Sequence, residues 1–77
     1  MYTWDMMKAV RSLNPPKNFH VDIIDHEDFL TVRADEIQFF KLTHDDKIAA
    51  VQYVQRVKDA LEQNGAVVLV VRKALEQ

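Results

Sequence analysis

Hydrophobic and polar positions follow two different periods along the chain, and the changes of period divide it into predicted elements. Hydrophobic residues recur at helical spacing over residues 4–13 and again over residues 44–63. Between these helices, alternating and aromatic-rich segments over residues 19–42 predict antiparallel strands. Residues 66–71 are hydrophobic without interruption, which is typical of a buried interior strand.

Capping and stop signals define the ends of the two long periodic segments. Thr3 and Thr43 can cap the helices, because a threonine side chain accepts a hydrogen bond from an amide of the first turn. Pro15 and Pro16 end the first helix, since proline lacks the amide hydrogen. Gly65 supplies the left-handed stop after the second helix.

The segment from residue 37 to residue 42, which follows Asp35 and Glu36, has two interpretations. Its aromatic and β-branched residues favour a third strand. A short helix capped by Asp35, with Gln38 three residues later, is the alternative. We expect the strand.

The resulting order of helix, three strands, helix and strand predicts an α/β (α+β) fold in one domain, residues 1–77. A long helix between two strands forms a right-handed crossover, so the last strand should lie parallel to an earlier one in a mixed sheet. The helices can cover both faces of this sheet, giving three layers, or one face, giving two.

Composition excludes several kinds of site. The 77 residues include no cysteine and a single glycine, which follows a helix. Disulfides, thiolate metal ligands and glycine-rich phosphate loops are therefore excluded. The longest hydrophobic run has six residues, whereas roughly 20 are needed to cross a bilayer. We expect a cytoplasmic protein without membrane contact.

Charge is unevenly distributed, although the formal net charge is only −2. Residues 22–46 carry eight acids against two bases, and both ends of the chain are mildly basic. An acidic hairpin of this kind can steer a basic partner or collect a cation. The absence of clustered positive charge disfavours nucleic-acid binding.

Asp22 or Asp25, together with Glu36 and Gln38, forms a candidate metal site. Carboxylates on neighbouring strands offer the hard oxygen ligands that Mg²⁺ prefers. The element order and these residues resemble the core of the PD-(D/E)xK nuclease superfamily, although Gln38 stands where that motif has lysine. The resemblance implies a Mg²⁺-dependent nuclease or an inactive relative.

Surplus hydrophobic surface favours protein binding over catalysis. The hydrophobic arc of the first helix spans roughly 220°, which is wider than one side of a small core uses. Ile48 and Val51 fall on the polar side of the long helix, where small hydrophobic patches are often contact surfaces. The candidate contact residues are Trp4, Met7, Ile48, Val51, Gln52 and Gln55.

We therefore expect a non-catalytic protein-interaction module without a cofactor. Its partner is another protein or a second copy of itself, as in a homodimer. The nuclease is the first alternative. The second is an acidic inhibitor of a nucleic-acid-binding protein, which would present the acids of residues 22–46 on one surface.

Overall fold

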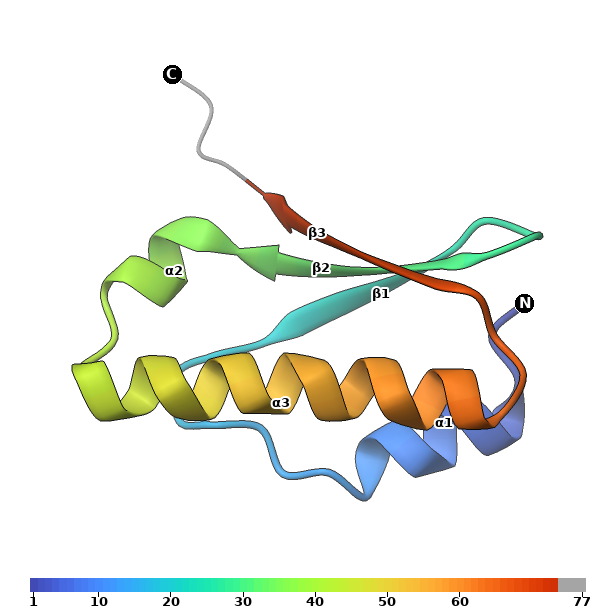
Figure 1. Cartoon of the computed structure of the whole chain (residues 1–77), viewed down its shortest axis with the longest axis horizontal. Coiled ribbons are helices and arrows are strands. Elements are labelled where there is room, and N and C mark those ends of the chain that lie inside the picture. The colour runs from blue at the N-terminus through green and yellow to red at the C-terminus, as the bar shows by residue number, and fades with distance from the viewer. Residues whose placement is uncertain (74–77) are drawn as a thin grey trace.

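The computed structural model describes the backbone of residues 1–73 and the side chains of residues 1–71 (Figure 1). In chain order its elements are α1 (Trp4–Arg11), β1 (Val21–Asp25), β2 (Leu30–Asp35), α2 (Glu36–Phe40), α3 (His44–Gln63) and β3 (Val68–Lys73). The predicted bounds of the long helix, 44–63, are confirmed. The first helix ends at residue 11 rather than at residue 13.

Threonine side chains cap the two longer helices, as the sequence predicts. The Oγ1 of Thr3 accepts a hydrogen bond from the N–H of Met6 at 3.2 Å. The Oγ1 of Thr43 accepts one from the N–H of Asp46, also at 3.2 Å. After α3, Gly65 adopts a positive φ of 94°, which costs glycine little because it has no Cβ.

The segment that follows β2 is a helix, so the third strand expected within residues 19–42 is wrong and the alternative is confirmed. The Oδ1 of Asp35 accepts hydrogen bonds from the N–H groups of Ile37, at 3.0 Å, and Gln38, at 3.3 Å. This cap satisfies the first amides of α2 locally, whereas a strand would need another strand beside it. The cap therefore outweighs the strand preference of the aromatic residues.

The three strands form a mixed sheet in the order β1-β2-β3. β1 runs antiparallel to β2, with Asp25 opposite Leu30. β2 runs parallel to β3, with Leu30 opposite Val68. The predicted mixed sheet with a parallel last strand is confirmed, and α3 lies on the connection between the two parallel strands.

The helices α1 and α3 lie on the same face of the sheet, and α2 continues from the end of β2 (Figure 1). The molecule therefore has two layers. The core between them consists of Met6, Phe19, Leu30, Val32, Ala50, Tyr53, Val57, Leu61 and Val68. Within it, the rings of Phe19 and Tyr53 meet edge to face, with centroids 6.5 Å apart.

β3 is an edge strand, so the prediction that residues 66–71 form a buried interior strand is wrong. Val68 is buried, but Val67, Leu69, Val70 and Val71 are 40–63% exposed. A hydrophobic run on both sides of a strand normally indicates two covered faces. Here the helices cover only one face, and β2 alone borders the strand.

Candidate protein-contact surface

The residues considered as metal ligands lie on two elements, Asp22 and Asp25 on β1 and Glu36 and Gln38 on α2. The Nη2 of Arg33 donates to the Oδ2 of Asp22 at 3.2 Å. Gln38 accepts a hydrogen bond from the N–H of His20 at 3.4 Å, and Glu36 begins α2. Within residues 1–73, no three His, Asp or Glu side chains gather closely enough to hold a metal ion.

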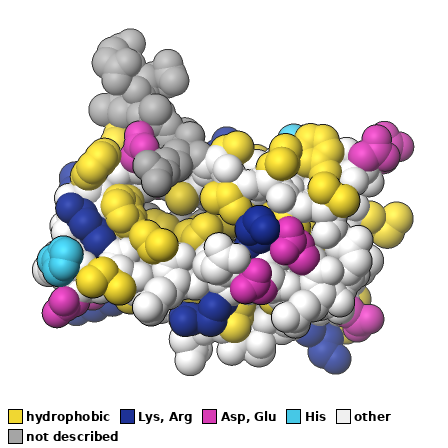
Figure 2. All heavy atoms as spheres, viewed as in Figure 1, with side chains coloured by type: hydrophobic (Ala, Val, Ile, Leu, Met, Phe, Trp, Pro, Cys, Tyr) yellow, Lys and Arg dark blue, Asp and Glu magenta, His cyan; other side chains and the backbone are white. Residues whose placement is uncertain are grey.

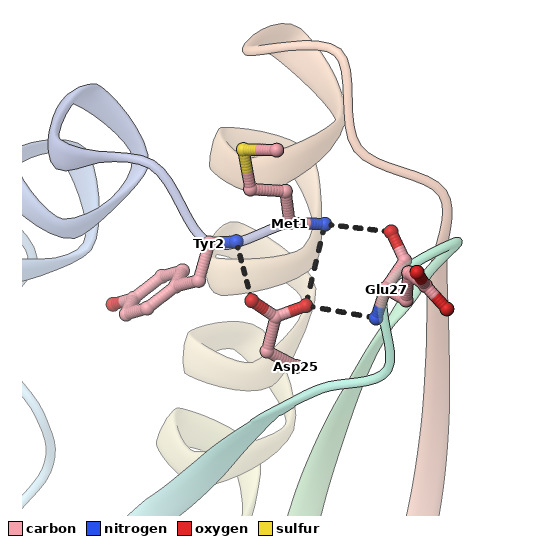
Figure 3. Close-up of polar contacts among 4 residues, drawn as sticks. All are labelled: Met1, Tyr2, Asp25 and Glu27. Carbon is pink, nitrogen blue, oxygen red and sulfur yellow. Dashed lines mark hydrogen bonds and ion pairs between the residues drawn. The ribbon is translucent and has the colours of Figure 1, made fainter.

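Asp25 joins the N-terminal segment to the β1–β2 turn (Figure 3). Its carboxylate accepts hydrogen bonds from the N–H groups of Tyr2, at 3.0 Å, and Glu27, at 3.1 Å. It also lies 3.3 Å from the amino group of Met1. The hydrogen bonds from Tyr2 and Glu27 favour the charged form and lower the pKa of Asp25 below its ordinary value of 3.8.

The hydrogen bond that Asp25 accepts from the N–H of Glu27 also explains why the β1–β2 turn needs no glycine. Glu27 has a positive φ of 68°, a conformation that side chains with a Cβ seldom adopt. An aspartate that accepts from the amide two residues later stabilises such a turn. Asp25 therefore holds the hairpin together.

The contact residues predicted from the sequence lie in two separate places. Trp4, Ile48 and Val51 are 65%, 47% and 59% exposed. Thr3, next to Trp4, lines a hollow with Asn64 beyond the end of α3. Ile48 lies 16 residues earlier on the same helix, which is roughly 24 Å at 1.5 Å per residue. Trp4 and Ile48 therefore do not form one surface.

A hydrophobic pocket opens beside α3, between α2 and the inner side of β3. Its volume is about 410 Å³, and its lining includes Phe40, Val51 and Val70, with polar contributions from Gln55 and Lys58. Figure 2 shows hydrophobic side chains gathered around this hollow on the side of the molecule where β3 lies in front. Val51 and Gln55 of the predicted contact residues thus lie at this pocket.

The strand beside the pocket is the part of the surface that the sequence analysis missed. We define the β3 surface as the exposed hydrophobic residues of β3, of the residue before it and of the pocket beside it, Phe40, Val51, Val67, Leu69, Val70 and Val71. Four of these six residues come from the run that was interpreted as interior strand. The sequence does contain a signal for this surface. A run that is hydrophobic on both sides needs a cover on both faces of the sheet, and the two longer helices leave one face uncovered if both pack on the other.

The two edges of the sheet differ in charge. β1 carries Asp22 and Asp25, both exposed, and charged side chains on an edge strand hinder pairing with another chain. Residues 67–71 contain neither a charge nor a proline. Among the residues that the structure describes, no strand lies beyond β3. The β3 edge is therefore open to a further strand, and the β1 edge is protected.

The free edge of β3 also presents backbone hydrogen-bonding groups. The N–H of Leu30 donates to the carbonyl of Val67 at 2.8 Å. In a parallel ladder, alternate residues direct their N–H and C=O groups to the neighbouring strand. Val67 and Leu69 thus face β2, whereas Val68 and Val70 direct their backbone groups to the open edge.

Charged residues flank the pocket. The Nζ of Lys47 lies 5.7 Å from the centre of the Phe40 ring, within the range of a cation–π interaction. The Nζ of Lys58 donates to the Oε2 of Glu62 at 2.8 Å, one helical turn later. This hydrogen bond raises the pKa of Lys58 above its ordinary value.

Comparison of the chain with protein-family models, curated proteins and solved structures finds no match. None of the helices within residues 1–73 is long and apolar enough to cross a membrane. The geometry of the β3 surface is consequently the basis on which a function can be inferred.

Proposed function

We propose that this chain is a non-catalytic protein-interaction module that binds an extended segment along the edge of β3. In this mode of recognition, backbone hydrogen bonds along the edge supply affinity, and pockets for alternate side chains supply specificity. Both parts are present in the β3 surface. Val68 and Val70 offer backbone groups, and the pocket beside them accepts hydrophobic side chains.

The observation that carries the proposal is the uncharged, exposed hydrophobic edge of β3 next to the pocket. Soluble monomers seldom leave a continuous hydrophobic strand open to solvent, because it pairs readily with other chains. Full burial of one valine or leucine side chain contributes about 1.5–3 kcal/mol. Covering even part of the β3 surface would therefore stabilise a complex substantially.

The two alternative functions have less support. The resemblance to the nuclease core depended on three strands before the long helix, and α2 replaces the third. An acidic inhibitor requires the acids of residues 22–46 on one surface. Asp25 lies opposite the first residue of β2 and Asp35 is the last residue of that strand, so these acids lie at opposite ends of the sheet.

The proposal can be tested with a peptide that copies residues 66–73. We expect it to bind saturably to the isotopically labelled chain at low micromolar protein concentration. Amide signals of β3, α2 and Val51 should shift together, and those of β1 should stay in place. Hydrogen exchange of the Val68 and Val70 amides should slow at least tenfold, because both amides become paired.

The control is the same peptide N-methylated at the positions of Val68 and Val70. It keeps every side chain but loses the two edge-facing donors, so we expect at least tenfold weaker binding. Equal binding of both peptides would show that the peptide does not pair through the edge that carries Val68 and Val70. Shifts spread over β1 would show that the β3 surface is not the site.

A further inference from the structure

We infer that the segment accepted by β3 is the same strand of a second copy, paired antiparallel about a two-fold axis through Leu69. This inference rests on the proposed strand addition and names its partner. Four features of the described residues support it: the faces of the strand, its backbone pattern, the charges at its two ends, and the position of α3.

The alternation of faces restricts how two β3 strands can pair. Val68 is buried and Val70 lines the pocket, so both point to the helix-covered face. Leu69 and Val71 point to the open face. A two-fold axis perpendicular to the sheet keeps each face on its own side, and residues directly opposite each other share a face. The axis must therefore pass through a residue, and Leu69, at the centre of the uncharged run 67–71, is compared with its neighbour Val70.

Hydrophobic matching favours the axis at Leu69. In that register Val68 lies opposite Val70, and Val67 lies opposite Val71 of the second copy. Every residue of the uncharged run is then paired with another hydrophobic residue. An axis at Val70 would pair Val68 and Val67 with the positions of Arg72 and Lys73, which lie outside the uncharged run.

In the same register, the backbone N–H and C=O groups at the free edge of β3 form hydrogen bonds with the second copy. Val68 and Val70 are the residues whose N–H and C=O groups face away from β2. Placed opposite each other, they form the type of antiparallel pair that exchanges both hydrogen bonds. Symmetry repeats this pair on the other side of the axis.

The charges at the two ends of β3 favour an antiparallel copy. Arg72 and Lys73 follow the hydrophobic run, and at its beginning Glu27 and Asp28 line a hollow together with Val67. An antiparallel copy brings its basic residues to this acidic end. A parallel copy would place Arg72 beside Arg72 and Lys73 beside Lys73, and like charges directly opposite each other are destabilising.

The position of α3 also fits a second copy. Because the axis is perpendicular to the sheet, both copies of α3 lie on the same face. The side of α3 that carries Val51 and lines the pocket faces the β3 edge. Pairing at that edge therefore turns the two pockets toward each other and lets the copies share their hydrophobic linings.

Charge variants at Leu69 test this arrangement, because on the axis this residue meets its own copy. We expect the wild-type chain to sediment as a dimer at 100 µM. Leu69→Lys and Leu69→Glu, each alone, should weaken dimerisation at least tenfold by repulsion of like charges. An equimolar mixture of the two variants should form a heterodimer, since opposite charges then meet.

Ile24→Lys is the matched control. Ile24 lies on the open face of the same sheet, next to Ile23, which pairs with the buried Val32, but it belongs to β1. This variant should dimerise like the wild type. Thermal unfolding followed by circular dichroism confirms that all variants fold, which is expected because Leu69 is 52% exposed.

Three results would overturn the inference: a monomeric wild type at 100 µM, dimerisation of the Leu69→Lys variant at wild-type strength, or a variant mixture that stays monomeric. A monomeric chain that still binds the residue 66–73 peptide would reject the second copy as partner and leave strand addition in place. A monomeric chain that does not bind this peptide would reject both.

Discussion

Asp25 links two segments that are more than twenty residues apart in the sequence. Its carboxylate accepts from Tyr2 and Glu27 and lies near the amino group of Met1. The residue is exposed, so its role depends on hydrogen bonds and not on burial. The sequence shows Asp25 only as a candidate metal ligand, because a contact with residue 2 cannot be read from local spacing.

The lowered pKa of Asp25 makes the stability of the hairpin depend on pH. The native chain binds this proton less tightly than the unfolded chain, so protonation favours unfolding. This contribution is present above the unfolded pKa, about 3.9, and is lost as the pH falls through the lower native pKa. We expect Asp25→Asn to be less stable than the wild type at pH 7, with the difference shrinking toward pH 2.

Urea unfolding at pH 7, 5, 3 and 2 measures this effect. The matched control is Asp28→Asn, which removes the same charge from the same turn. A stability difference between wild type and Asp25→Asn that stays constant from pH 7 to pH 2 would contradict the role assigned to the carboxylate.

At the scale of elements, the sequence predicts the bounds of a helix well where a local capping or stop signal determines them. The caps Thr3 and Thr43 and the stop at Gly65 place the two longer helices nearly as observed. Residues 36–40 were predicted less well, because a hydrogen-bonding cap and strand propensity gave opposite signals. Asp35 decided in favour of the helix, since its bonds form without any distant partner.

The misinterpretation of residues 66–71 has a different cause. Uninterrupted hydrophobicity indicates that both sides of a strand avoid water, but it does not say which chain covers them. Val67, Leu69 and Val71 remain exposed in the single copy. In the inferred dimer β3 becomes a central strand, but the open face that carries Val67, Leu69 and Val71 is still not covered by a helix.

Two exposed residues of α3 allow the contribution of the pocket to association to be distinguished from that of the rest of the helix surface. Val51 lines the pocket, whereas Ile48 is exposed in the second turn of α3 and is not part of the lining. We expect Val51→Asp to weaken association at least tenfold, because it places a charge in the hydrophobic lining. Ile48→Asp should have a smaller effect. Sedimentation of both variants measures this difference, and equal effects would argue against the pocket as part of the contact.

At the scale of the whole molecule, a chain of 77 residues has a small reserve of stability. A domain of this size buries about 60–65% of the surface that its unfolded chain exposes, so its free energy of unfolding is a few kcal/mol. Association adds to this value in proportion to the logarithm of concentration. In the proposed dimer, the same surface would therefore serve both binding and stability.

The link between association and the free energy of unfolding gives a prediction that can be tested with the purified chain alone. We expect the thermal midpoint of the wild type to rise when the protein concentration increases from 1 to 100 µM, since the dimer forms only from folded chains. The midpoint of Leu69→Lys should not change. Calorimetry at both concentrations distinguishes the two, and a constant midpoint for the wild type would contradict a dimer that contributes to stability.

The aspartates of β1 have a consequence for the size of any assembly. Once two copies join through β3, the outermost strands on both sides are β1 strands, and each carries Asp22 and Asp25 along its rim. A third molecule would have to pair with an edge strand that carries charged side chains, which hinders further growth of the sheet. A chain with an exposed hydrophobic edge at β3 can thus form a dimer without forming fibres, because the charged residues of β1 at the other edge of the sheet disfavour the addition of further strands.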